Sequence, residues 1–350
     1  MMRNGEDVVG NMRKRLLPLR VIGPAGLVML VALAFAAGSV GASSAVDARV
    51  LLSRMMSAEE TVHASFSQTE ARVLAKRLET TTERVYLDSG RKRSERYESK
   101  YAKTVVTVTD GENTWTYVTG LPFVLREPAR QGTLRAGKST GLLIAGLGTV
   151  EFGGRTADLV ETTNKLGVKT RFWIDGDTFL LLKEERYDEQ GRTIYSMNRT
   201  NLDFSPPDAP GRFSFTPGRD VKVLTEKHAW KRAVFAHIAA DRVPFPVLVP
   251  GFVPVGFAFE TGDIIEVQES PVVVSRFRKG NLLLLLFQRE AASVQERAVG
   301  GRKKVLTRPQ GDVAIFEQRQ GGFVLTLIGP ISEKDARQVL ASLAPFKDDQ

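Results

Sequence analysis

The most specific chemical pattern in the chain is formed by Gly132, Gly137, Lys138 and Ser139, which match the phosphate-loop pattern GxxxxGK[ST]. Such a loop binds nucleotide when a buried strand precedes it and a helix follows, because backbone N–H groups at the helix start hold the phosphates. Here residues 126–130 precede it, and they are charged and contain a proline. We therefore expect a basic loop, and an NTPase is only the third of three functional hypotheses.

Other residues that could bind metal or transfer protons are few. The histidines His63, His228 and His237 do not have the spacing of metal ligands. Asp175 and Asp177 flank a glycine, as turn-forming carboxylates do. The chain contains no cysteine, which excludes disulfides, thiolate catalysis and Cys-ligated zinc. We expect no catalytic residues, no metal and no cofactor.

Large apolar side chains in strand-like segments are the better candidates for function. They could line a groove that holds an acyl chain, or they could simply fill the core, and both readings stay open. The candidate groove residues are Phe66, Trp115, Tyr117, Phe123, Trp173 and Leu182.

The segment that must position several of these residues spans 169–201. It predicts three strands, over 169–174, 180–187 and 193–201, separated by turns rich in Asp and Gly. A meander of this kind exposes apolar side chains that need a cover. The preceding residues supply one, since 46–56 has the pattern of an amphipathic helix.

Further strands are predicted on both sides of this meander. They cover 61–73, 82–88, 91–99, 103–109, 114–119, 149–152 and 157–162. Residues 126–147 are basic and Gly-rich, and we expect a loop there with one helical turn at 140–144. The elements follow one another without βαβ alternation, which favours a large, strongly bent antiparallel sheet plugged by a helix.

A second region begins after Pro- and Gly-rich breaks near 205–218. It contains a predicted helix over 226–241, strands over 272–278, 282–288, 312–318 and 323–328, and a last helix over 333–343 for which Ser332 is a suitable N-cap. The run 282–286 is entirely leucine, so we expect a strand buried on both faces.

The N-terminal residues have the order of an export signal. Basic residues up to Arg20 precede an apolar run over 21–37, and small residues follow, which allows cleavage after Ala42 or Ala45. An uncleaved anchor and a start at Met12 instead of Met1 stay open. The net charge of +9 has no interleaved Arg–aromatic pattern, so we expect no nucleic-acid partner.

Motifs in both regions resemble those of the MucB/RseB family of sigma-factor regulatory proteins. In the first region they are LLSRMMSAEETVHASFSQ, VTDGENTWTYV, FGGRTADLVE and RFWIDGDTFLLLKEERYDEQGRTIY; in the second they are VPGFVPVGF, SRFRKGNLLLLLFQ and FVLTLIGPISEKDARQVLASL. The resemblance implies a LolA/LolB-like open half-barrel with a plugging helix, followed by a smaller α+β domain. Its concave apolar face would hold an acyl chain.

The resulting expectation is a mainly β (α+β) protein in four parts: a signal or anchor over 1–45, a LolA-like domain over 46–220, a linker helix with a Pro-rich stretch over 221–250, and a C-terminal α+β domain over 251–346. By resemblance it is a periplasmic, non-enzymatic regulator of an extracytoplasmic sigma-factor pathway, with a membrane-bound anti-sigma factor and a lipid or lipoprotein as partners. The alternative is a LolA-like carrier of lipid or lipoprotein. A homo-oligomer stays open.

Overall fold

The computed structural model describes residues 45–74, 77–129, 142–291, 304–307 and 313–347. All of them fall within the unit Val40–Gln350. Their strands form sheets of twelve, six and two strands. The signal segment and the phosphate-loop lookalike lie outside the described residues.

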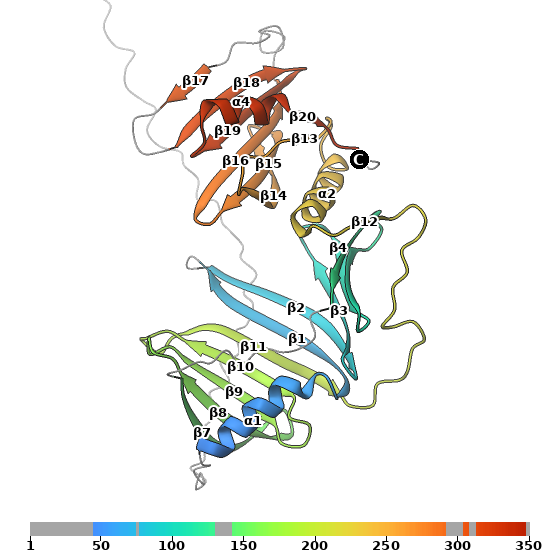
Figure 1. Cartoon of the computed structure of the whole chain (residues 1–350), viewed down its shortest axis with the longest axis vertical. Helices are drawn as coiled ribbons and strands as arrows, with labels where there is room; N and C mark the ends of the chain where they lie inside the picture. The colour runs from blue at the N-terminus through green and yellow to red at the C-terminus, as the bar shows by residue number, and fades with distance from the viewer. Residues whose placement is uncertain (1–44, 75–76, 130–141, 292–303, 308–312, 348–350) are drawn as a thin grey trace, which may run out of the picture. The chain divides into compact units, whose positions relative to one another are not determined.

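The twelve-stranded sheet dominates the first region (Figure 1). In spatial order its strands are β12 (Lys222–Leu224), β6 (Phe123–Pro128), β5 (Asn113–Val118), β4 (Lys103–Thr109), β3 (Arg91–Glu98), β2 (Arg77–Asp88), β1 (His63–Leu74), β11 (Thr193–Asp203), β10 (Leu181–Tyr187), β9 (Lys169–Asp175), β8 (Arg155–Thr163) and β7 (Leu143–Phe152). All neighbours are antiparallel except β12 and β6, which pair in parallel. The open antiparallel sheet is thus confirmed, with one parallel edge that the sequence did not indicate.

Helix α1 (Ala45–Ala58) lies across β7 and β8 on one face of this sheet (Figure 1). Ala48 is fully buried against Val160 and Ile174, and Leu51, Leu52 and Met55 pack around them. Fully burying a leucine or methionine side chain stabilises the fold by about 1.5–3 kcal/mol. The predicted covering helix is therefore confirmed, and its apolar stripe is what holds it on the sheet.

The predicted meander corresponds to β9, β10 and β11, and its boundaries agree to within two residues. Other expectations in this region were wrong. Of the helical turn expected at 140–144, residues 140 and 141 lie outside the described residues, and residues 143 and 144 belong to β7, which pairs with β8. Strand β6 was not predicted, because its short sequence FVLREP ends in charges and a proline and lacks alternation. Both β6 and β7 form because they pair with neighbouring strands, since the strand propensity of their own sequences is weak.

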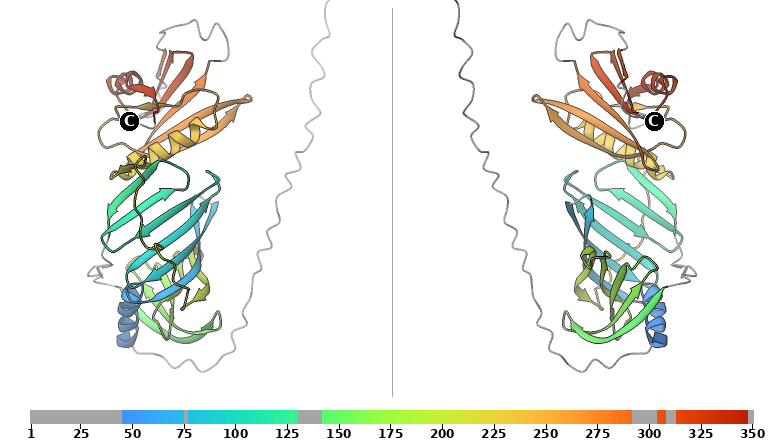
Figure 2. Two further views of the ribbon diagram at one scale, coloured as in Figure 1. Left: turned by 90° about the vertical axis from the view of Figure 1, so that its right-hand side faces the viewer. Right: turned by 90° about the vertical axis from the view of Figure 1, so that its left-hand side faces the viewer.

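The six-stranded sheet forms the second region. In spatial order it contains β14 (Ala258–Val267), β15 (Ser270–Lys279), β16 (Leu282–Glu290), β19 (Phe323–Gly329), β18 (Ala314–Gln320) and β17 (Lys304–Thr307). Helix α4 (Glu333–Ala341) packs beside β18 and β19 (Figure 2). Ser332 caps it by accepting a hydrogen bond from the Asp335 N–H at 3.0 Å, as predicted. Strand β14 was not predicted, because Gly262 and acidic residues interrupt its apolar pattern.

The leucine run in β16 is not buried on both faces, which corrects the sequence-based expectation. Leu284 and Leu286 are buried in the core of this sheet, whereas Leu283 and Leu285, which point to the other face, are only partly buried. The strand lies in an antiparallel sheet with one face covered by apolar side chains, including Val339 of α4. Burial therefore alternates along the strand even though the residue type does not.

Helix α2 (Lys227–Ala240) connects the two regions and packs on β6, β12 and β14. Trp230, Val234 and Ile238 form one apolar cluster with Phe123, whereas Phe235 belongs to the core of the six-stranded sheet. A two-stranded sheet of β13 (Leu248–Pro250) and β20 (Leu343–Pro345) lies beyond it. The domain boundaries at 45, 220 and 250 stay predictions.

Candidate ligand-binding site

A cavity of about 330 Å³ opens near the C-terminal end of α1, between the helix and the sheet. Its apolar lining consists of Met55, Met56, Leu87 and Leu181. Its charged lining consists of Glu59, Glu60, Arg91, Lys92 and Arg199. Ligand pockets commonly have volumes of about 300–1,000 Å³. An apolar wall beside a charged rim suits an amphiphilic molecule.

Local sequence explains how the lining residues come together. The β2–β3 hairpin turns at Ser89 and Gly90, which have φ of 47° and 83°, so that Leu87 and Lys92 face each other across the pair. Positive φ at both turn positions is the geometry of a tight hairpin, and glycine adopts it without strain. The turn therefore places an apolar and a cationic side chain next to the last turn of α1.

An ionic network joins the helix end to the sheet. The Arg199 Nε donates to the Gln68 Oε1 at 3.0 Å, and its Nη2 donates to Glu59. The Lys92 Nζ donates to the other Glu59 oxygen at 3.1 Å. Burial opposes ionisation of Glu59, but attraction to Arg199 and Lys92 and their hydrogen bonds outweigh it and lower its pKa to about 2. Glu59 is thus a fixed anion between two cations, not a proton carrier near neutral pH.

Arg199 is the most buried charged residue of the cavity, with a side chain only 5% exposed. Its guanidinium lies over the ring of Phe66 at 4.5 Å from the centroid. A cation above an aromatic face is attracted by the ring quadrupole. The sheet therefore holds this arginine in one orientation beneath α1.

The six predicted groove residues do not lie on one face of the sheet. Across neighbouring strands, Phe66 pairs with Val85, which pairs in turn with Ser94, then Thr107, then Thr116. Paired residues lie on the same face of the sheet, so Thr116 shares the face of Phe66. Side chains alternate between faces along a strand, so Trp115 and Tyr117, which flank Thr116, lie on the opposite face. Both contact Phe215 there, with ring centroids 5.6 and 4.6 Å apart.

The remaining three differ in their placement. Trp173 pairs with Lys183, Lys183 with Asn198 and Asn198 with Thr69, and Thr69 lies on the face opposite Phe66, so Trp173 shares the face of Trp115. Phe123 lies on the Phe66 face by its register with β5, but it is buried against α2. Leu182 is fully buried, and the register of β10 with β9 shifts at this residue, so alternation does not assign its face. A role of any of the six in ligand binding stays a prediction.

The carboxylates and histidines considered for chemistry have structural surroundings. Asp175 is fully buried and accepts hydrogen bonds from Thr178 and Arg155, whereas Asp177 is exposed. The His63 Nε2 donates to the Pro206 carbonyl oxygen at 3.1 Å, and its Nδ1 lies 3.3 Å from an Asp88 carboxylate oxygen. Among the described residues, no group of three or more His, Asp or Glu is arranged to hold a metal ion. No described helix is long and apolar enough to cross a membrane.

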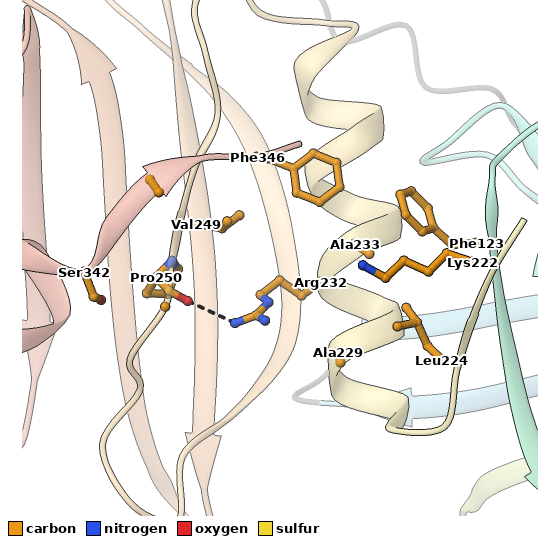
Figure 3. Close-up of a pocket in the computed structure, with 12 residues that line it drawn as sticks. Phe123, Lys222, Leu224, Ala229, Arg232, Ala233, Val249, Pro250, Ser342 and Phe346 are labelled. Carbon is orange, nitrogen blue, oxygen red and sulfur yellow. Dashed lines mark hydrogen bonds between the residues drawn. The ribbon is translucent and has the colours of Figure 1, made fainter. Parts of the chain in front are cut away.

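A second, smaller cavity of about 200 Å³ lies beside α2 (Figure 3). The Arg232 Nη1 donates a hydrogen bond to the Pro250 carbonyl oxygen at 3.1 Å, and Phe123 and Phe346 also line the cavity. Burial lowers the pKa of Arg232. The arginine serves here as a bridge between α2 and β13.

Sequence reasoning missed the charged residues of the larger cavity. Glu59 follows a helix, Lys92 lies in the polar strand RKRSERYE, and Arg199 lies in a strand that is mostly polar. Such residues are ordinary on solvated strand faces. Their meeting depends on the register of β1 with β11 and of β2 with β3, which a single sequence does not reveal.

Neither a protein-family model nor a curated protein matches this chain. Among solved structures the chain is similar to a LolA superfamily protein from Nitrosomonas europaea, with 12% identity over 48% of this chain and 97% of that chain and a TM-score of 0.25.

Two MucB structures cover more of the chain. The MucA/MucB complex of Pseudomonas aeruginosa has 16% identity over 86% of this chain and 99% of that chain, with a TM-score of 0.35. MucB in complex with MucA(peri) has 16% identity over 86% and 100%, with a TM-score of 0.33.

Proposed function

We propose that this chain is an exported, non-enzymatic regulator that binds an acyl-chain ligand with its twelve-stranded sheet and a membrane-bound anti-sigma factor as its protein partner. Ligand binding changes the affinity of the protein for the anti-sigma factor, and in this way an envelope signal reaches an extracytoplasmic sigma factor. The protein acts in the periplasm.

The observation that carries the proposal is the cavity between α1 and the sheet. Met55 and Met56 form one of its walls and Leu87 another. Methionine side chains adapt to ligands of varied shape, and each buried CH₂ of an acyl chain contributes about 0.8 kcal/mol. A cavity of this volume and lining is suited to an apolar chain with a polar end.

The charged residues beside the cavity favour binding over catalysis. Glu59 is held by two cations, and the pKa of Asp175 is lowered because hydrogen bonds from Arg155 and Thr178 outweigh its burial. A general base works best with a pKa near the operating pH, and neither carboxylate has one. Their placement is that of groups that fix structure.

The six-stranded region favours a regulator over the alternative, a LolA-like carrier of lipid or lipoprotein. A carrier needs only the sheet and its covering helix. Here a second region with its own core, built on Phe277, Leu284 and Leu327, accompanies them. We assign partner binding to this additional region.

The test is a cross-linking pull-down of the full chain from bacterial envelopes. The proposal predicts capture of a single-span membrane protein that also binds a sigma factor on its cytoplasmic side. Deleting residues 251–346 should abolish that capture. Capture of lipoproteins alone, unchanged by the deletion, would support the carrier and contradict the regulator.

A further inference from the structure

One nitrogen of Arg199 is without a partner. The Nε donates to Gln68 and the Nη2 donates to Glu59, whereas the Nη1 is buried and has no hydrogen-bond partner in the described part of the chain. Buried polar atoms in native proteins are nearly always hydrogen-bonded, so an exception calls for a reason. Because Arg199 lines the cavity, a ligand oxygen is a suitable reason.

Lys92 offers further donors at the same place. An ammonium group has three N–H donors, and one of them is directed to Glu59 at 3.1 Å. Arg91, the third cation of the lining, is held by Asp88 outside the cavity. The donors that can meet a ligand therefore come from Arg199 and Lys92.

The charges at this place match a ligand with one negative charge. Arg199 and Lys92 are cations, and Glu59 between them is an anion, so a single positive charge is left over. Glu60 is exposed, where solvent screens its charge. A dianionic phosphate would approach Glu59 with an uncompensated charge, whereas a carboxylate would not.

We propose that the cavity is a carboxylate site for a fatty acid, in which Arg199 Nη1 and Lys92 bind the head group and Met55, Met56 and Leu87 contact the chain. This inference rests on the proposed acyl-chain binding and assigns its head-group chemistry. Guanidinium and ammonium donors form strong, charge-assisted hydrogen bonds with carboxylates. The same donors have no charge to pair with in a fatty alcohol.

The test compares dodecanoate, dodecan-1-ol and dodecyl phosphate by isothermal titration calorimetry, below their micelle concentrations. Wild-type protein should bind dodecanoate at least about tenfold more tightly than the alcohol, as expected for a hydrogen bond to a charged group. Lys92→Gln should remove most of that preference. Lys169→Gln is the matched control, because Lys169 also pairs with a glutamate at 3.1 Å but does not line the cavity.

Arg199→Lys retains the charge and loses the free Nη1, so it should also weaken dodecanoate binding without changing alcohol binding. If this variant does not fold, the acid-over-alcohol preference of Lys92→Gln still tests the carboxylate site. Equal binding of acid and alcohol would overturn the carboxylate site and leave acyl-chain binding intact. Tighter binding of dodecyl phosphate would overturn the single-charge assignment. Failure of all three ligands to bind would overturn the proposed acyl-chain binding itself.

Discussion

Arg155 and Asp175 join the ends of two hairpins in the twelve-stranded sheet. The Arg155 Nη2 donates to the Asp175 Oδ1 at 3.0 Å, and its Nε donates to the other carboxylate oxygen. Asp175 is fully buried, and its Oδ1 also accepts from the Thr178 N–H at 2.9 Å. The pair thereby fixes the turn between β9 and β10 against the start of β8, beside the residues that pack on α1.

Replacing Asp175 should destabilise this part of the sheet. Asp175→Asn leaves the Arg155 charge with only the exposed Asp177 as an anionic partner, and breaking a buried ion pair from one side costs about 3–5 kcal/mol. We expect about 3 kcal/mol by urea unfolding, because Arg155 is partly exposed. Asp177→Asn is the control, since its side chain is 88% exposed and should change stability by less than about 1 kcal/mol. Equal effects would contradict the structural role of Asp175.

Acid should weaken the link between α1 and the sheet. The pKa of Glu59 is lowered from 4.5 to about 2 in the folded state. Its ionised form therefore stabilises the fold above about pH 4.5, and this contribution is lost as the pH falls toward 2. Thermal melts of Glu59→Gln should depend less on pH in that window than those of wild type. Parallel curves for wild type and variant would contradict the network, and Glu60→Gln serves as the neighbouring control.

Trp115 should matter for stability and not for ligand binding. It is buried, contacts Phe215, and donates from its indole N–H to Asp110 at 3.1 Å. Trp115→Ser should cost about 3–5 kcal/mol, as for other truncations of buried aromatic residues. Because it lies on the face opposite Phe66, dodecanoate affinity of the folded variant should equal that of wild type. A selective loss of affinity would mean that the ligand binds on the Trp115 face.

Gly262 should tolerate no side chain. A Cβ placed there would lie 2.2 Å from the Phe235 ring of α2. Gly262→Ala should therefore force α2 away from β14 and cost about 1–3 kcal/mol in thermal unfolding. Gly218→Ala is a suitable control, since its new Cβ would lie 3.7 Å from the nearest atom, a Val221 methyl. An unchanged melting temperature in Gly262→Ala would contradict the close packing.

The strands and the covering helix could largely be predicted from the sequence. Asp-Gly turns and β-branched runs identify β9, β10 and β11 locally, and Ser332 identifies the start of α4. The first half of β7 and the whole of β14 could not be predicted, because glycine and charge interrupt their patterns and pairing with neighbours stabilises them. The leucines of β16 show the converse, since residue type alone does not tell which face is covered.

The candidate site could be predicted only in part. Aromatic residue types pointed to an apolar face, and Phe66 does lie next to the cavity arginine. The division of the aromatics between two faces depends on the register of nine strands, β1 to β6 and β9 to β11. The network of Glu59, Lys92 and Arg199 joins residues up to 140 positions apart in the chain, so only the folded sheet brings it together.

The cavity itself can be filled to test ligand binding. Met56→Trp places a larger side chain in the cavity and should block an acyl chain. Val50→Trp is the matched control on the same helix, because Val50 is 47% exposed and does not line the cavity. Both variants should remain folded, which circular dichroism and thermal melts would check.

Native mass spectrometry of the protein, purified without detergent from the envelope of a bacterium that exports it, tests the central claim most directly. We expect wild type and Val50→Trp to carry one added mass that fragments to an acyl chain, and Met56→Trp to lack it. A wild-type protein that is free of lipid, and that takes up no dodecanoate when it is offered, would contradict the account.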